Sequence, residues 1–345
     1  MADDLIPEFG EYTAGDNEEA LALEKTCMQG TSYRMWFKRD TFHRRAENFG
    51  EWYMYTARVN GRLAGLLGAA IKDATLFGEP VKAVFFFDAR THADFRNRGI
   101  SRQLMAHATE LLRPRVNLGY IYTIADSRIV PHLAAKFGVR DCGGYTYLVY
   151  PVFRARQYNG RYRSASFGEV HESMISANGG FDFYSSPDCS EGRGGYAGSR
   201  MLDSLRGVAG CSIWDNRGIL GEVIETVPFY IRTVGSVAGM WPLNKLRRPA
   251  LPQPGEEVRS WYLFDFHATG PVVARDLIRA VAAEALDHAI DYCYIPHARR
   301  EAWVQALRSD VPRLFSPLIN YRLLLKGFDR HIPAIERLYV DIRDL

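Results

Sequence analysis

The fold of this chain is decided by residues 81–105, VKAVFFFDARTHADFRNRGISRQLM. Residues 81–88 are nearly all apolar, which predicts a strand that is buried on both faces of a sheet. Residues 100–112 follow with helical spacing, which gathers four apolar side chains on one face: Leu104, Ala108, Leu111 and Leu112. The arginine-rich turn between them therefore opens an amphipathic helix.

This turn has the composition of an anion site. The first turn of a helix leaves its N–H groups unpaired, and the helix dipole makes that end positive. Gly99 lets the backbone approach an anion closely, Ser101 keeps the path clear, and Arg96, Arg98 and Arg102 surround the turn. A plain basic loop before a surface helix would explain the glycine alone. The whole stretch predicts a pyrophosphate on the helix N-terminus.

The segments around this turn predict a mixed α/β sheet. Asn60-Gly61 separates two apolar runs, residues 52–59 and 63–71, which is a strong hairpin signal. Further along the chain, residues 120–125 and 145–152 are typical of strands, and residues 129–137 have a helical pattern. Strands and helices therefore alternate around the turn, as in an α/β domain of about 150 residues.

The motif Arg96-x-x-Gly99-x-Ser101 resembles the acyl-CoA signature Arg/Gln-x-x-Gly-x-Gly/Ala of the GCN5-related N-acetyltransferases (GNAT), with only the serine departing. The resemblance covers roughly residues 5–152, because the predicted elements also occur in the family's order. It implies that backbone amides of the turn hold the CoA pyrophosphate, and these belong to Arg96, Asn97, Arg98, Gly99, Ile100 and Ser101. It also implies that the strand near residues 87–91 splays from its neighbour and pairs with the pantetheine arm through Ala89 and Thr91.

Acyl transfer to an amine needs a base, donors for the oxyanion and a proton for the leaving thiolate. Many GNAT relatives carry a tyrosine four residues before a Gly-Phe pair; here the pair is Gly138-Val139 and the position is Ala134. The remaining candidates are Tyr122 and His132 as acids, and Asp88 and Asp126 as bases.

Each of these candidates also has a structural interpretation. Asp88 could pair with an arginine, Asp126 could cap the following helix, and His132 could be a surface residue. A chain of waters could replace the base. Cys142 beside Gly143-Gly144 is more typical of a packed turn than of a nucleophile.

The second half repeats the pattern of the first. Residues 207–214 and 219–231 flank a turn as the first hairpin does, residues 261–266 repeat the aromatic strand, and a helix is expected over 273–290. Strands are expected over 321–326 and 337–342. Aligning Leu277 with Leu104 puts Thr269, Val272 and Ala274 opposite Arg96, Gly99 and Ser101. The second copy therefore lacks the phosphate turn, and we expect it to complete the acceptor pocket or an interface.

The length of 345 residues thus divides into three predicted parts. Residues 1–153 are the acyl-CoA-binding domain, residues 154–206 are a linker or insertion rich in Gly, Ser, Arg and Tyr, and residues 207–345 are the degenerate copy. The fold class is α/β with a mixed sheet, a tandem GNAT-like acyl-CoA N-acyltransferase fold whose N-terminal copy is intact.

Composition excludes several other classes. With 43 basic and 40 acidic residues, the net charge of +3 gives no reason to expect a nucleic-acid partner. The five cysteines form no C-x-x-C pair, so no metal site is expected. No run of about 18 apolar residues spans a membrane, and the acidic start Met-Ala-Asp-Asp is unlike a signal peptide, so we expect a soluble, cytoplasmic protein.

These observations lead to one predicted function and two alternatives. The first is an acyltransferase that moves an acyl group, acetyl in the first instance, from acetyl-CoA or another acyl-CoA to a primary amine of a small molecule or peptide by direct attack. The alternatives are a non-catalytic acyl-CoA-binding or regulatory protein, and an acyltransferase that takes long acyl chains from CoA or a carrier protein. The identity of the acceptor and the oligomeric state stay open.

Overall fold

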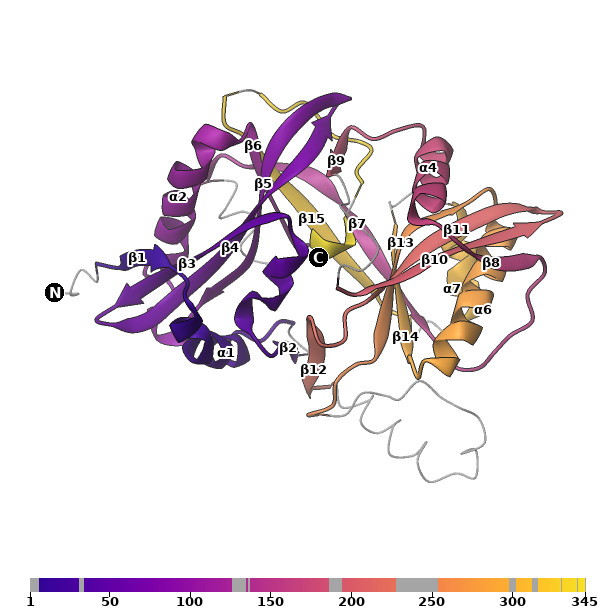
Figure 1. Ribbon diagram of the computed structural model, residues 1–345, viewed down its shortest axis with the longest axis horizontal. Helices are drawn as coiled ribbons and strands as arrows, with labels where there is room; N and C mark the ends of the chain where they lie inside the picture. Colours follow the sequence, from indigo (N-terminus) through magenta and orange to yellow (C-terminus); the bar gives the residue numbers. More distant parts are fainter. Residues whose placement is uncertain are drawn as a thin grey trace.

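A computed structural model describes residues 6–30, 34–125, 135, 137–185, 194–227, 254–297, 302–311, 316–329, 331–339 and 341–344. These residues form a mixed sheet of 13 strands, flanked by helices, and a separate two-stranded sheet (Figure 1). The elements of the N-terminal part, with 3-10 helices written η, are β1 (Glu8–Glu11), η1 (Ala14–Asp16), α1 (Asn17–Thr26), β2 (Arg34–Lys38), η2 (Phe42–Asn48), β3 (Glu51–Val59), β4 (Arg62–Leu76), β5 (Glu79–Thr91), η3 (Ala93–Phe95), α2 (Ile100–Leu112), η4 (Arg113–Arg115), β6 (Leu118–Ile124) and β7 (Arg140–Pro151).

The C-terminal part contributes the remaining elements. They are β8 (Arg161–Ala165), α4 (Phe167–Asn178), β9 (Phe183–Ser185), β10 (Tyr196–Ser204), β11 (Gly207–Asp215), β12 (Gly221–Thr226), β13 (Ser260–Ala268), α6 (Pro271–Asp287), β14 (Tyr292–His297), α7 (Ala302–Asp310), β15 (Leu318–Gly327) and η7 (Ile342–Asp344).

The segment that decides the fold behaves as its sequence predicts, except that Leu111 of α2 is exposed rather than on the buried face. The hairpin at Asn60-Gly61 joins β3 to β4, and β5 is buried at the centre of the sheet. Alternate side chains of β5 enter two separate cores: Phe85 packs toward α1 and η2, whereas Phe86 packs toward the apolar face of α2. Helices therefore cover both faces of the strand that leads into the arginine-rich turn.

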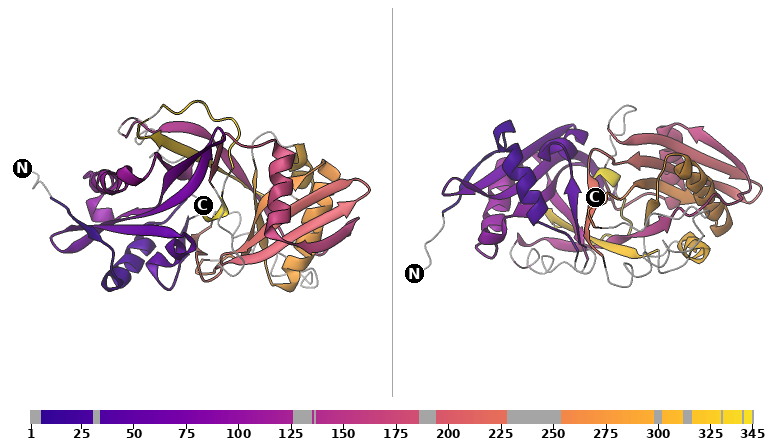
Figure 2. Two further views of the ribbon diagram at one scale, coloured as in Figure 1. Left: turned by 45° about the horizontal axis from the view of Figure 1, so that its top comes forward. Right: turned by 90° about the horizontal axis from the view of Figure 1, so that it is seen from below.

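Two strands are exchanged between the halves of the molecule. The sheet runs β1-β3-β4-β5-β6-β15-β7-β14-β13-β11-β10-β8. β15, near the C-terminus, pairs with β6, whereas β7 pairs with β14. β15 and β7 also pair with each other, so one continuous sheet joins the two halves (Figure 2). A boundary at residue 153 therefore separates segments of chain but not independent sheets.

Three other sequence-based expectations are wrong. Residues 154–206 are not a loose linker, because they contain α4 and the paired strands β8 and β10. The segment after residue 219 does not form a hairpin with β11; β12 pairs instead with β2, far away in the sequence. Among the described residues of 337–342 there is no strand: Leu338 makes a single β-bridge to Phe183, and Ile342 begins the short helix η7. In each case the structure depends on a contact with a distant segment of the chain, which the local sequence pattern does not indicate.

The sheet contains two copies of one α/β unit with matching register. In the first copy, residues 83–85 of β5 pair with residues 118–120 of β6; in the second, residues 260–262 of β13 pair with residues 292–294 of β14. Both pairs of strands are parallel, and in both the pairing stops after three residues. The second copy is thus β8, β10, β11, β13 and β14 with α4 and α6, and it begins near residue 161 rather than 207.

A β-bulge marks the same place in each copy. Asp88 and Ala89 lie opposite the single residue Leu67, and the register of β13 against β11 shifts in the same way around Asp265. Both aspartates have a positive φ, 48° for Asp88 and 52° for Asp265. Such a φ is uncommon for a residue with a side chain, although aspartate tolerates it better than most. The bulge turns each strand away from its parallel neighbour.

Candidate active site

The first candidate feature is the opening between β5 and β6. The two strands pair only as far as Phe85 and Tyr120, although β5 continues to Thr91 and β6 to Ile124. Beyond Phe85, the edge of β5 that faces β6 has no strand partner among the described residues. Ala89 and Thr91 lie on this free stretch, half-buried. No described strand pairs with this edge, so an extended ligand could add to it as the resemblance implied, although the carbonyl oxygens of Ala89 and Thr91 accept hydrogen bonds from Arg90 and Arg96.

The arginine-rich turn follows directly and is open to an anion. Asn97 and Gly99 both have a positive φ, and Gly99 is the N-cap of α2. Because the N-cap residue is a glycine, it has no side chain to cap the helix, and the N–H groups of the first turn have no partner within the helix. The buried side chain of Ile100 anchors the turn against the core, and Ser101 is half-buried.

Cations surround this helix end. Arg98 and Arg102 are exposed, and within the described part of the chain neither side chain has a hydrogen bond or an ion pair. Arg96 differs, because its guanidinium donates to the carbonyl oxygens of Thr26, at the end of α1, and Thr91. It therefore holds the turn in place, while Arg98 and Arg102 remain available to a ligand.

Asp88 does not suit the role of a general base. Its carboxylate is buried and lies 2.6 Å from Nη1 of Arg39, 3.3 Å from Nη1 of Arg45 and 3.6 Å from Nη2 of Arg90. Burial alone would raise the pKa of Asp88, but the three guanidinium groups hold this pKa well below its ordinary value. A carboxylate that is so strongly stabilised as an anion has little tendency to take a proton, so the interpretation as an arginine partner is correct.

The same arginines belong to a larger buried network. Glu24 of α1 accepts from Arg39 at 2.8 Å and from Arg90 at 3.0 Å. Arg45 also donates to the carbonyl oxygen of Arg343, in η7. The network therefore ties α1, η2 and the C-terminal turn to the bulge of β5.

Tyr122 lies at the opening between β5 and β6. It follows Tyr120 on β6, just past the point at which β5 departs, and its ring contacts Phe85 and Tyr145. Its hydroxyl is buried and has no hydrogen-bond partner among the described residues. Burial, together with the negative charges of Asp344 and Asp341, raises the pKa of Tyr122 well above 10. The phenol thus keeps its proton and can donate a hydrogen bond to a ligand atom.

The remaining residues of the sequence analysis are Asp126, His132, Ala134 and Cys142. Asp126, His132 and Ala134 lie outside the described residues. Burial raises the pKa of the Cys142 thiol to about 11, so this thiol is protonated at neutral pH and a poor nucleophile.

The sequence did not reveal the charged group behind Tyr120. Lys72 of β4 contacts the carboxylates of Asp341 and Asp344 at 2.7 and 2.6 Å, and Tyr120 donates to Asp344 at 2.7 Å. All of these side chains are buried. Only the tertiary structure brings η7 back to β4 and β6, so the one local hint of this group was Lys72, at the end of a long apolar run in β4.

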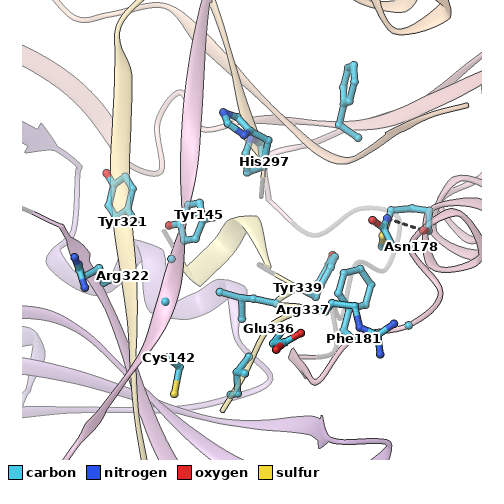
Figure 3. A pocket seen from close by; sticks show the side chains of 18 of the residues that line it. Cys142, Tyr145, Asn178, Phe181, His297, Tyr321, Arg322, Glu336, Arg337 and Tyr339 are labelled. Atoms are coloured by element: carbon cyan, nitrogen blue, oxygen red, sulfur yellow. Dashed lines mark hydrogen bonds between the residues drawn. The ribbon is translucent and has the colours of Figure 1, made fainter. Parts of the chain in front are cut away.

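A large cavity opens beside this site, at the separation of the second strand pair. Its volume is about 590 Å³, and its lining includes Asp265 of β13, His297 of β14, and Tyr145 of β7. Figure 3 shows Tyr145 and Tyr321 on one side and Phe181 and Tyr339 across from them. Tyr321, on β15, pairs with Ile124 of β6. Because adjacent strands lie about 4.8 Å apart, the cavity begins one strand away from the opening between β5 and β6.

Comparison with known families now identifies the N-terminal domain. Residues 8–138 match the family described as acetyltransferase (GNAT) domain. This part of the chain is a GNAT domain. The match confirms the resemblance and the acyltransferase class that it implied, and it covers the elements from β1 to just before β7.

Solved structures support the fold over the whole chain. An N-myristoyltransferase from Saccharomyces cerevisiae with bound myristoyl-CoA has a TM-score of 0.59 at 10% identity, covering 93% of this chain and 83% of its own. A GCN5-related N-acetyltransferase from Kribbella flavida has a TM-score of 0.50 at 13% identity, covering 94% and 71%. Among curated proteins, no sequence matches significantly. At these identities the likeness concerns the fold, which extends beyond the GNAT domain into the second copy.

The described helices were also compared with the length of a bilayer. None of them is both long enough and apolar enough to cross a membrane.

The network around Asp88 predicts a pH-dependent stability. Because the folded-state pKa of Asp88 lies below its unfolded value near 4, its stabilisation is complete above about pH 5 and is lost as the pH falls toward the folded-state pKa. Asp88→Asn keeps a residue that tolerates the positive φ but removes the charge, and we expect it to cost about 3–5 kcal/mol at pH 7. Urea unfolding from pH 7 to pH 3 should show this difference shrinking below about pH 4.

The matched control is Asp329→Asn, because Asp329 pairs with Arg113 at an exposed position. Its effect should stay below about 1 kcal/mol. A difference between wild type and Asp88→Asn that is equally small, or independent of pH, would contradict the assigned role.

Proposed function

We propose that this protein is an acyl-CoA-dependent N-acyltransferase that transfers an acyl group to a primary amine. The observation that carries the proposal is the joint presence, in a GNAT domain, of an opened strand pair and an uncapped helix N-terminus with two unpaired arginines. A cytoplasmic location is part of the same proposal. We assign the second copy no donor site, because only Thr269 and Gly270 separate β13 from α6, and Pro271 has no N–H to offer.

The donor would bind along the first copy. Backbone N–H groups from Ile100 onward, together with Arg98 and Arg102, would hold the pyrophosphate, because that end of the helix concentrates positive charge. The pantetheine arm would extend along the free edge of β5 at Ala89 and Thr91. The thioester would then reach the point where β5 leaves β6, near Tyr122.

The transfer itself would be a direct attack. The neutral amine adds to the thioester carbonyl carbon, the tetrahedral intermediate expels the CoA thiolate, and the C–N bond replaces the C–S bond. The ammonium proton leaves to water, and the thiolate takes up a proton from solvent. Tyr122, which keeps its own proton, would stabilise the departing sulfur or the oxyanion by donating a hydrogen bond.

A specific observation favours a donor longer than acetyl. An apolar cavity of about 200 Å³ begins at the opening, at Phe86 and Ile121, and extends toward the last turns of α2. Its other walls are formed by residues that include Met105, Phe137 and Phe328. Such a space would take several methylene groups, each of which contributes about 0.8 kcal/mol on burial. The second candidate is therefore transfer of a medium or long acyl chain by the same site.

Binding of the donor is tested at the turn. Gly99→Glu would place a negative charge at the pyrophosphate position, and we expect acyl-CoA affinity to fall by at least about 100-fold, or ~2.7 kcal/mol. Gly99→Ala is the matched control, because it also places a side chain at φ +80° but adds no charge. Its loss of acyl-CoA affinity should be clearly smaller than that of Gly99→Glu. Titration calorimetry with acetyl-CoA measures both, and equal affinities for the two variants would refute the assigned site.

The role of Tyr122 is tested by turnover. Tyr122→Phe removes only the hydroxyl, so we expect kcat for thiol release to fall about 10- to 100-fold with unchanged acyl-CoA affinity. Tyr147→Phe is the control, since its hydroxyl is equally buried and without a partner among the described residues but lies on β7. The assay follows free CoA with acetyl-CoA and a panel of primary amines. Absence of release with every amine, despite tight CoA binding, would favour a non-catalytic binding protein.

Chain-length preference tests the second candidate. We expect octanoyl-CoA to bind at least about 10-fold more tightly than acetyl-CoA, because its chain would fill the apolar cavity. Ala106→Phe, at an exposed position on α2 that lines this cavity, should remove the preference and leave acetyl-CoA affinity unchanged. Equal affinities for the two donors in the wild-type protein would restrict the site to short acyl groups.

A further inference from the structure

We infer that the cavity at the second strand opening is the acceptor site and that it selects amines carrying a second cationic group. The inference rests on the proposed function, since it names the acceptor of the same reaction. Three observations support it. The two copies share the same bulge and strand opening, and only the first copy has the arginine-rich turn. The third observation is the set of charged side chains that line the cavity.

The second copy keeps the architecture of a ligand site without its anion turn. β13 bulges at Asp265 and leaves β14 after Tyr262, in the register at which β5 bulges and leaves β6. Gly270, however, is extended with φ −173°, and Pro271 begins α6 without an N–H. The opening therefore persists as a cavity that is no longer adapted to a pyrophosphate.

The position of the cavity suits an acceptor. Tyr321 and Arg322 in its wall pair with Ile124 and Thr123 of β6, next to Tyr122. An amine held in the cavity would thus lie within about one or two strand spacings, roughly 5–10 Å, of the thioester position. The volume of about 590 Å³ would hold about 20 non-hydrogen atoms, at roughly 30 Å³ for each.

The charges in the lining favour a cation. Arg322 pairs with Asp141, and Arg337 lies 3.6 Å from Asp182 and donates to the carbonyl oxygen of Gly179, so both guanidinium groups are engaged. The carboxylate of Glu336 is exposed in the cavity wall and, within the described residues, has no ion-pair partner.

A second carboxylate lies at the inner end of the cavity. Asp265 is buried and accepts hydrogen bonds from Tyr339 at 2.8 Å and from Nδ1 of His171 at 2.8 Å, while Tyr184 is 2.5 Å from the other nitrogen of that ring. Asp265 and Tyr339, which share this hydrogen bond, both line the cavity, and Figure 3 shows Tyr339 there.

Aromatic rings complete this environment. Tyr145, Phe181 and Tyr339 present rings to the cavity from three different segments. The face of an aromatic ring attracts ammonium groups, and the attraction is stronger where water is excluded. Rings and carboxylates together form a site for an organic cation, whereas an acceptor with a carboxylate beside its amine would be repelled by Glu336.

Three amine probes with five carbon atoms each distinguish a cation-selective site from a neutral or anion-selective site. They are 1,5-diaminopentane, 1-aminopentane and 5-aminopentanoic acid, which end in a second ammonium, a methyl group and a carboxylate. Calorimetry with the full chain, with and without CoA, should give an affinity for the diamine at least about 10-fold above that for the monoamine. The amino acid should bind most weakly. Equal binding of the three compounds would overturn the inference.

Two variants locate the binding. Glu336→Gln should lower the affinity for the diamine about 10-fold, and Phe181→Leu should lower the affinity for the diamine several-fold. Glu336→Gln should leave the affinity for acetyl-CoA unchanged. Glu18→Gln, at an exposed position on α1, is the control and should change neither affinity. A Glu336→Gln protein that still prefers the diamine would exclude this cavity as the source of the preference.

These experiments can refute the cation site without refuting the acyltransferase function, and the reverse. Diamine preference without CoA binding would refute the acyltransferase proposal and leave the cation site in place. Thiol release that is equally fast with all three probes would support the acyltransferase and refute the cation site.

Discussion

The structure depends on a negative charge that is buried at a bend in the central strand. Asp88 lies at the bulge of β5, inside the protein, where an unpaired carboxylate would cost several kcal/mol. Arg39, Arg45 and Arg90 offset this cost, and Glu24 balances two of them in turn. Because these partners come from separate segments, satisfying one carboxylate fixes how α1 and η2 pack onto the sheet. The bend itself opens the space between β5 and β6.

The second copy solves the same problem with different groups. Asp265 occupies the equivalent bulge, but a histidine and a tyrosine rather than arginines contact its carboxylate. The bulge in the strand is thus the same in both copies, whereas the side chains that contact its carboxylate differ. This difference is consistent with two roles for two openings: an arginine-rich copy that would take an anionic donor, and a tyrosine-rich copy that would take a cation.

The exchange of β7 and β15 fixes the spacing between the two openings. Each strand pairs with the other copy's parallel strand, so the openings lie on one continuous sheet with two strands between them. Rings from both copies meet at this seam, where Tyr145 stacks on Tyr321 and contacts Tyr122. In two domains joined by a flexible linker, the distance between the openings would vary. Here the hydrogen-bonded strands between the openings fix that distance.

Much of the first copy was predictable because its signals are local. An Asn-Gly turn needs a left-handed backbone, a strand that is nearly all apolar needs burial on both sides, and Gly99 precedes a helix of clear periodicity. The role of Asp88 was not predictable, since Arg39 and Arg45 lie more than 40 residues away. The start of the second copy was missed because polar residues in β8 and β10 hide their pairing, although Phe-Asp at 87–88 and again at 264–265 was a usable sign of the repeat.

The sequence by itself determined the GNAT character of residues 8–138 and the arginine-rich turn before α2, because both depend on neighbouring residues whose backbone and charge act over a few ångströms. Only the tertiary structure decided which strands are exchanged, which carboxylates are neutralised, and that a cavity lies beside Tyr122. Those features depend on pairings between residues that are tens to hundreds of positions apart. Such pairings are selected by burial and hydrogen bonding of the whole sheet, and no short stretch of the chain encodes them.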